Sequence, residues 1–185
     1  MKRVLSLVLV LLLVFSISAC GKKETSSGRE SIDIEYYAGI GSIPECSYSL
    51  GQDVDELNAD LEEHYNTVED EMVYEVTEGK TTAKIDNGTF QYYYVKDKKE
   101  DGVSYIVNFD TAYGFNIGTV SVEILDALNE YKYTEEAMND DNAFFVLGAT
   151  EGKVVKYEFS ENAVSFIFVN DALYATAVYK ISDWE

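Results

Sequence analysis

The feature that most restricts the fold is an internal similarity between two segments that lie 67 residues apart. Residues 50–63 align with residues 117–130, and the aligned positions share apolar residues, a glycine and two glutamates. The pairs are Leu50 with Ile117, Gly51 with Gly118, Glu56 with Glu123, Leu57 with Ile124, Leu61 with Leu128 and Glu63 with Glu130. A second match aligns residues 102–108 with residues 163–169 at an offset of 61. Two matches in the same order predict a duplicated unit.

Each unit is predicted to begin with a helix. In the first unit, Asp53 and Glu56 have capping-box spacing, in which each side chain accepts from an otherwise unpaired backbone N–H. This predicts a helix over residues 53–65. In the second unit, Thr119 is the expected N-cap of a helix over residues 119–131. The apolar stripes at helical spacing are Val54, Leu57, Leu61 and Tyr65, and Val120, Ile124, Leu128 and Tyr131.

Antiparallel strands are predicted after each helix. Asp86-Asn87-Gly88 is a strong hairpin turn between strands over residues 81–85 and 89–95. Further turns are predicted at residues 160–162, between strands over residues 154–159 and 164–169, and at residues 170–171, before a strand over residues 174–181. Each unit is therefore a helix followed by an antiparallel meander of three or four strands. The fold class is α+β.

The predicted domain organisation follows from these elements. Residues 32–185 form a single α+β domain made of two tandem repeats. The repeats cover about residues 45–110 and 111–181.

Alternation along the strands assigns one sheet face to the core. The expected core residues are Phe90, Tyr92, Tyr94, Val103, Tyr105, Val107, Phe109, Val155, Tyr157, Phe159, Val164, Phe166 and Phe168. The opposite face mixes apolar and polar residues, namely Thr89, Gln91, Tyr93, Val95, Ser104, Ile106, Asn108, Lys156, Glu158, Ser165, Ile167 and Val169. That face fits a solvated surface, a second buried layer or a binding surface. Tyrosine supplies large, stiff contact area at interfaces. We therefore take Tyr93, Ile106 and Ile167 as candidate partner contacts.

The duplicated helix and meander, with an apolar residue and a glycine leading into each helix, resembles the β-lactamase-inhibitory-protein-like superfamily. The resemblance covers most of residues 45–181 and includes the steps Leu50-Gly51-Gln52 and Ile117-Gly118-Thr119. That group includes a small lipoprotein of the outer-membrane β-barrel assembly machine. The resemblance implies a protein-binding scaffold. The secreted inhibitors use disulfides that this chain cannot make, and no residue of their inhibitory loops matches here.

The beginning of the chain has the pattern of a secretory signal. Lys2 and Arg3 precede an apolar run over residues 4–17, and Ser18-Ala19 leads into Cys20. The run is about 14 residues, whereas a membrane-spanning helix needs roughly 20. An ordinary cleaved signal also fits, but it does not require Cys at this place.

These residues resemble a bacterial lipoprotein signal. The resemblance implies a signal peptide over residues 1–20, with a diacylglyceryl anchor, and so palmitate, on Cys20. Residues 21–31 are polar and predict a flexible tether. The expected location is the extracytoplasmic face of the cell membrane, with the membrane contacted through the lipid on Cys20.

Charge excludes one class of partner. Removing Lys2 and Arg3 from the 14 basic residues leaves 12 against 34 acidic ones, a net charge of −22. We expect no nucleic-acid binding, because phosphate contacts need Lys and Arg. Residues 30–78 hold 15 acidic residues and no Lys or Arg. This acid suits solubility, and it also permits a basic partner or divalent cations.

No catalytic pattern stands out. Cys46 is the only cysteine besides Cys20, so an acylated Cys20 leaves a lone thiol, which is either reactive or a half-buried apolar group. His64 is the only histidine and lies near the end of the first predicted helix. A pocket in which two acids lie beside His64 would favour an enzyme. We expect no enzymatic activity, no cofactor and no metal.

Residues 139–142, Asn-Asp-Asp-Asn, are rich in oxygen but lack the spacing of a calcium loop. The sequence thus favours a lipid-anchored extracytoplasmic module that binds another envelope protein. The alternative is a surface lipoprotein that binds a cation or a small ligand, which requires carboxylates that converge in one concavity.

Overall fold

The computed structural model describes residues 33–67, 75–78, 82–139, 142–143 and 151–183. The predicted signal peptide, the tether and Cys20 lie outside these residues. Within the described part of the chain, no helix combines the length and the apolar character that crossing a membrane requires.

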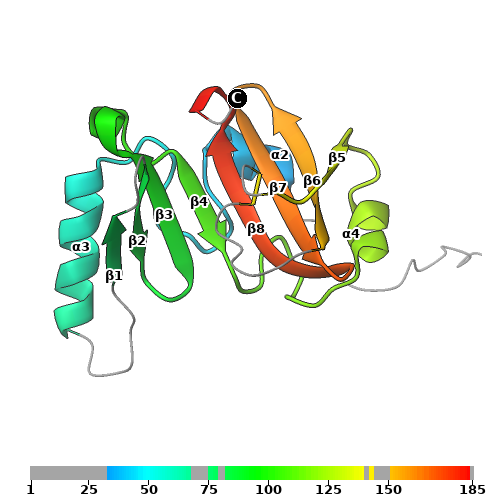
Figure 1. The fold of residues 1–185 in the computed structure, drawn as a ribbon, viewed down its shortest axis with the longest axis horizontal. Helices are drawn as coiled ribbons and strands as arrows, with labels where there is room; N and C mark the ends of the chain where they lie inside the picture. Colours follow the sequence, from blue (N-terminus) through cyan, green and yellow to red (C-terminus); the bar gives the residue numbers. More distant parts are fainter. Residues whose placement is uncertain (1–32, 68–74, 79–81, 140–141, 144–150, 184–185) are drawn as a thin grey trace, which may run out of the picture.

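Eight strands of the described residues form one antiparallel sheet in the order β1-β2-β3-β4-β8-β7-β6-β5 (Figure 1). The strands are β1 Glu75–Glu78, β2 Thr82–Asp86, β3 Phe90–Val95, β4 Tyr105–Asn108, β5 Thr134–Ala137, β6 Gly152–Phe159, β7 Asn162–Val169 and β8 Ala172–Lys180. The two four-stranded halves meet where β4 pairs with β8. The predicted α+β class is confirmed, and the strands around the turn at Asn87 match their expected bounds within two residues.

Within the described residues, three α-helices accompany the sheet: α2 Ile34–Gly39, α3 Val54–Thr67 and α4 Ser121–Ala127. Two short 3₁₀ helices, η1 Lys96–Asp101 and η2 Ile181–Asp183, follow β3 and β8. The first predicted helix is confirmed as α3. The Asp53 carboxylate caps it by accepting from the amides of Asp55 and Glu56, both at 2.9 Å.

The second predicted helix is shorter than expected, and Thr119 is not its cap. The Thr119 carbonyl accepts from the Leu173 amide at 2.8 Å, and Val120 forms a bridge with Ala172. These bonds to β8 hold the chain extended until Ser121 begins α4. At the other end, Leu128 leaves helical geometry, so the helix stops well before residue 131.

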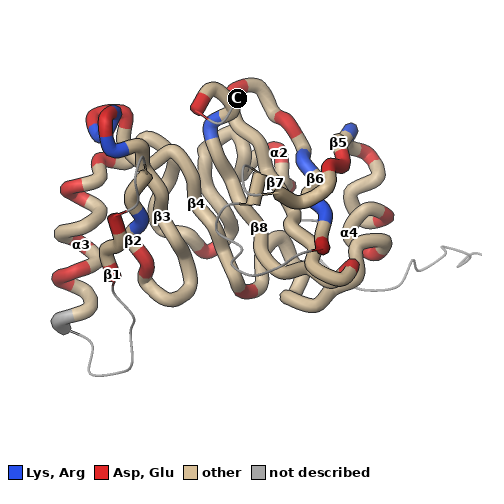
Figure 2. Tube along the Cα trace, in the orientation of Figure 1, with Lys and Arg blue, Asp and Glu red and all other residues tan. Residues whose placement is uncertain are grey.

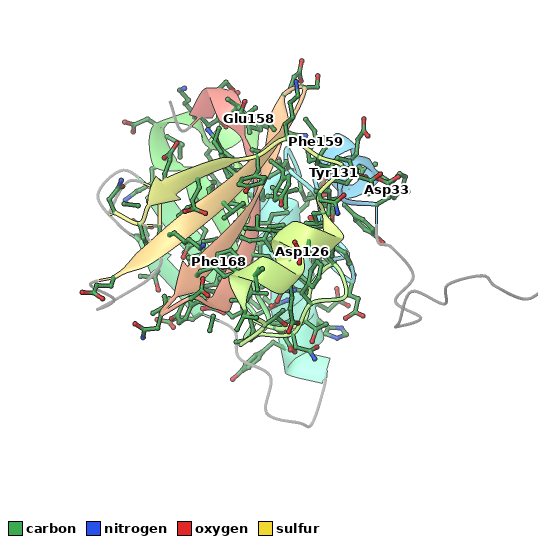
Figure 3. All side chains as sticks on the ribbon, turned by 90° about the vertical axis from the view of Figure 1, so that its right-hand side faces the viewer. Asp33, Asp126, Tyr131, Glu158, Phe159 and Phe168 are labelled. Atoms are coloured by element: carbon green, nitrogen blue, oxygen red, sulfur yellow. The ribbon has the colours of Figure 1, made fainter. Side chains whose placement is uncertain are left out.

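All three helices contribute to one apolar cluster on one face of the sheet. The buried members from the helices are Ile34, Ala38, Val54, Leu57, Leu61 and Ile124. Together with Leu128, which directly follows α4, they pack with Tyr92, Val155, Phe166 and Phe168 of the strands. At the α4 end, Tyr131 meets Phe159 edge to face at 5.5 Å (Figure 3). The helix stripes are therefore buried as expected, apart from Tyr65 and Val120, which are exposed.

The centre of the second face of the sheet is also buried, which favours one of the three interpretations left open by the sequence, while the edge strands β1 and β5 are exposed at every position. Its apolar cluster consists of Tyr93, Tyr105, Val107, Ala143, Val154, Ile167, Ala175 and Ala177. Met138 and Phe109 pack against the edge of this cluster. The mixed face is therefore a second buried layer.

The face assignment of β4 was wrong. Ile106 lies in the helix-side cluster, whereas Tyr105, Val107 and Phe109 lie on the second face. The cause is an irregularity at Ser104, whose amide donates to the Tyr93 carbonyl at 2.9 Å before the regular ladder begins. Two residues, Ser104 and Tyr105, therefore separate Val103 from Ile106, which both point to the helix side. In a regular strand one residue would separate them, so the additional residue moves every later side chain of β4 to the other face.

The second sequence match was also misleading. It aligned residues 102–108 with residues 163–169, which sets β4 against β7. In the sheet, β4 and β8 are the last strands of their halves and lie next to each other. Alternating apolar residues occur in all of these strands, so the pattern alone does not distinguish them.

Candidate functional site

The three residues predicted to contact a partner are buried. Tyr93 is 7% exposed, and Ile106 and Ile167 are 0% exposed. The Tyr93 hydroxyl donates to Gln91 Oε1 at 2.6 Å within the sheet. In this structure these side chains belong to the packing of the two layers, so an accessible site has to be sought elsewhere.

A groove of about 790 Å³ opens between the loop before α3, the α3 helix and the turn that joins β2 to β3. We call it the α3 groove. Its lining consists of Glu45, Ser47, Tyr48, Asp60, Leu61, His64, Asn87, Gly88, Thr89, Phe90 and Tyr92. Its volume falls in the range of about 300–1,000 Å³ that is typical of ligand sites.

The loop wall of the groove is held by local hydrogen bonds. The Cys46 amide donates to the Ile43 carbonyl at 3.0 Å, and the Ser42 hydroxyl donates to the Tyr48 carbonyl at 2.8 Å. Between these bonds Glu45 has φ of 69°, a left-handed conformation that is uncommon outside glycine. The turn leaves the side chains of Glu45 and Ser47 exposed.

Hydrogen bonds from backbone amides to the side chains of Asp86 and Asn87 fix the hairpin wall of the groove. The Asn87 Oδ1 atom accepts from the amides of Thr89 at 3.2 Å and Phe90 at 2.8 Å. The Asp86 carboxylate accepts from the Gly88 amide at 2.9 Å. Because the side chains of Asp86 and Asn87 satisfy these three amides, the turn keeps one shape beside α3.

Aromatic rings form the inner wall. Tyr48 and Tyr92 meet edge to face, with ring centroids 5.6 Å apart. The Tyr92 hydroxyl lies 3.5 Å from the Cys46 sulfur. The Tyr48 hydroxyl donates to the Asp60 carboxylate, which reaches across from α3. This bond connects the loop to the helix and fixes the position of one carboxylate oxygen in the groove.

The ionisable side chains of the lining are Glu45, Asp60 and His64, and none of the described lining residues is Lys or Arg. Helix α3 carries five acidic residues and no Lys or Arg, and its acidic side lies at the end of the molecule away from α4 (Figure 2). Among the described residues, no ion pair involves Glu45 or Asp60. The groove is therefore negative.

Glu45, Asp60 and His64 line the groove together, so the arrangement that we named as favouring an enzyme is present. The neighbouring thiol does not suit that role, because burial raises the pKa of Cys46 and so disfavours the nucleophilic thiolate. Burial likewise raises the pKa values of Tyr92 and Tyr48, which keeps both hydroxyls protonated. The groove is suited to hydrogen bonding, aromatic contact and charge attraction.

The structure does not gather metal ligands in the described part of the chain, where no group of three or more His, Cys, Asp or Glu converges. In the oxygen-rich segment, Asn139 and Asn142 accept from each other's amides at 3.0 and 2.8 Å. Their side-chain oxygens thus serve the turn, while Asp140 and Asp141 lie outside the described residues.

The sequence had indicated parts of the groove but not their meeting. The turn at Asn87 and the helix with His64 were both predicted. Nothing in the sequence signalled that Glu45 and Asp60 share a concavity. Their proximity follows from the packing of Leu57 and Leu61 against the strands.

Comparisons with known proteins give little further guidance. No family model matches the chain, and no curated protein matches it in sequence. A solved structure that it resembles is a DUF4309 family protein, YjgB, from Bacillus subtilis. The two are 12% identical with a TM-score of 0.48, over 79% of this chain and 92% of the other.

Proposed function

We propose that this protein is a lipid-anchored extracytoplasmic module that binds another envelope protein through the α3 groove. The observation that carries the proposal is the contrast in accessibility. The centres of both sheet faces are buried, including the three residues first expected to contact a partner, whereas carboxylates, hydroxyls and aromatic rings line the groove. The anchoring rests on the sequence, in which Cys20 directly follows the apolar run and Ser18-Ala19.

We further propose that the two halves are tandem repeats of the β-lactamase-inhibitory-protein-like kind. Support comes from element order, because α3 precedes β1–β4 and α4 precedes β5–β8. Gly51 and Gly118, which the sequence alignment pairs, both have positive φ, at 80° and 90°. A repeat of this kind is a scaffold for protein contacts.

The second candidate function is binding of a small ligand or cation. The specific observation in its favour is that Glu45 and Asp60 line one concavity. The two functions differ in what becomes attached to the groove in the cell, a protein or a small molecule.

Photo-crosslinking separates them. A benzophenone amino acid replaces Ser47 in the full chain, expressed in cells of the source organism and irradiated. We expect a discrete adduct with a protein at position 47. The matched control carries the probe at Val122, an exposed residue of α4 at the other end of the molecule. Absence of an adduct at position 47, or equal adducts at both positions, would overturn the proposal.

A further inference from the structure

We infer that the α3 groove receives a basic side chain of the partner protein, a guanidinium or ammonium group on an aliphatic stem. This inference deepens the proposed function and rests on it. Three independent features of the groove lead to it: the charge of its lining, its aromatic wall and its size.

The first feature is uncompensated negative charge at a fixed position. Asp60 is held by the Tyr48 hydroxyl, which occupies only one oxygen of its carboxylate. The second oxygen is available for a charge-assisted hydrogen bond, which is stronger than a neutral one. Glu45 adds a second carboxylate on the facing loop.

Among the described residues, no lysine forms an ion pair with Glu45 or Asp60. Lys99 pairs with Asp55 at the beginning of α3. Lys84 pairs with Asp86 at 3.0 Å and is directly opposite Tyr93, which lies on the second face of the sheet. Both therefore serve other carboxylates, which leaves the groove for a cation from another molecule.

The second feature is the aromatic wall. Tyr48, Phe90 and Tyr92 line the same groove as the two carboxylates; Tyr48 is half-buried, whereas Phe90 and Tyr92 are 7% and 1% exposed, so Tyr48 is the most accessible ring. Ring faces attract organic cations and also pack against the aliphatic stem of Lys or Arg. A neutral or anionic ligand would gain from the rings but not from Glu45 and Asp60.

The third feature is size. A volume of about 790 Å³ greatly exceeds that of a bare ion. Among the described residues, the carboxylates and His64 do not converge as a metal-binding group. The geometry thus fits a side chain with several atoms better than a metal.

The test uses the chain from Gly21 onward, which contains every described element, labelled with ¹⁵N. The probes are acetyl-Gly-Arg-Gly-amide and the same tripeptide with citrulline, which replaces the guanidinium by a neutral urea of similar shape. We expect saturable shifts of the Ser47, His64 and Thr89 amides with the arginine peptide. The citrulline peptide should bind about tenfold or more weakly, because it cannot form the ionic hydrogen bond.

Two variants of equal charge provide the control. Asp60→Asn can still accept from Tyr48, so it removes charge while keeping the wall together, and it should weaken arginine binding about tenfold. Asp126→Asn removes one charge on the exposed side of α4, at the far end of the molecule (Figures 1 and 3), and should leave binding unchanged.

Equal affinity for the arginine and citrulline peptides would overturn the inference, and so would equal losses in the two variants. Absence of saturable shifts up to about 10 mM would do the same, because that concentration nearly fills a site with a Kd of about 1 mM. A protein adduct at position 47 in spite of such failure would leave the proposed function standing. Arginine binding without any adduct would support the groove chemistry and overturn the protein partner.

Discussion

Gly51 and Gly118 make the same backbone contact in the two halves of the molecule. The Gly51 amide donates to the Val103 carbonyl at 2.7 Å, and the Gly118 amide donates to the Leu173 carbonyl at 2.8 Å. In each half the acceptor residue also donates back, Val103 to Gln52 at 3.0 Å and Leu173 to Thr119 at 2.8 Å. Backbone hydrogen bonds thus join the segment before α3 to the beginning of β4, and the segment before α4 to the beginning of β8.

This contact makes Gly102 sensitive to substitution. Gly102 has φ of 76°, and an added Cβ would lie 2.6 Å from the Gln52 and Gly51 carbonyl oxygens. Gly102→Ala should therefore destabilise the domain by about 2 kcal/mol or more, measured by urea unfolding. Gly39→Ala, whose Cβ would meet nothing within 4 Å, is the control and should cost little. Equal stability of the two variants would contradict the role of the contact.

The buried helix stripes predict a large cost of truncation. Leu57→Ala and Leu128→Ala remove side chains that are 0% and 6% exposed, and each should lower the free energy of unfolding by about 2–5 kcal/mol. Val122→Ala, at a residue that is 55% exposed, should change it by less than about 0.5 kcal/mol. Losses near zero at either leucine would show that its stripe faces water in solution.

The corrected face of β4 predicts that Ile106 is a core residue. Ile106→Asp places a charge in the helix-side cluster and should cost about 4 kcal/mol or more, enough to prevent stable folding. Circular dichroism and thermal unfolding measure this, with Val122→Asp as the exposed control. A folded Ile106→Asp protein with an unchanged unfolding midpoint would mean that this face is accessible.

The buried hydroxyl of Tyr157 predicts that the stability of the protein decreases at alkaline pH. It is buried with no hydrogen-bond partner among the described residues, and burial raises the pKa of Tyr157 to about 12. The unfolded state therefore releases this proton first, and stability falls as the pH rises from about 10 to 12.

Tyr157→Phe should remove the part of the alkaline loss of stability that Tyr157 causes. At pH 7 it should be neutral or slightly stabilising, because no hydrogen bond is lost. Urea unfolding at pH 8 and pH 11 measures the difference for both proteins. Tyr174→Phe, at an exposed residue of β8, is the matched control. An identical alkaline loss in Tyr157→Phe and the unmodified chain would refute the assignment.

The proposed lipid anchor on Cys20 predicts a simple labelling result. Cells given radiolabelled palmitate should label the unmodified protein and Cys46→Ser, but not Cys20→Ser, because only Cys20 follows the predicted signal. Label on Cys20→Ser would mean that the lipid is attached elsewhere.

The local elements follow from the amino-acid sequence alone. Asp53 and Asn87 each satisfy backbone amides of their immediate neighbours, so α3 and the β2–β3 turn were readable from a few adjacent letters. Alternate residues of a strand point to the same face. The alternation of Phe90 and Tyr92, and of Val164, Phe166 and Phe168, therefore identified the core face of β3 and β7.

Features that depend on contacts between distant segments could not be predicted in this way. The pairing of Val120 with Ala172 shortened α4, and the contact of Ser104 with Tyr93 reversed β4. The α3 groove is a third case, because Tyr48 and Asp60 meet only when the helix packs on the sheet. The periodicity of apolar residues indicates which side chains are buried, but it does not indicate which segments they pack against.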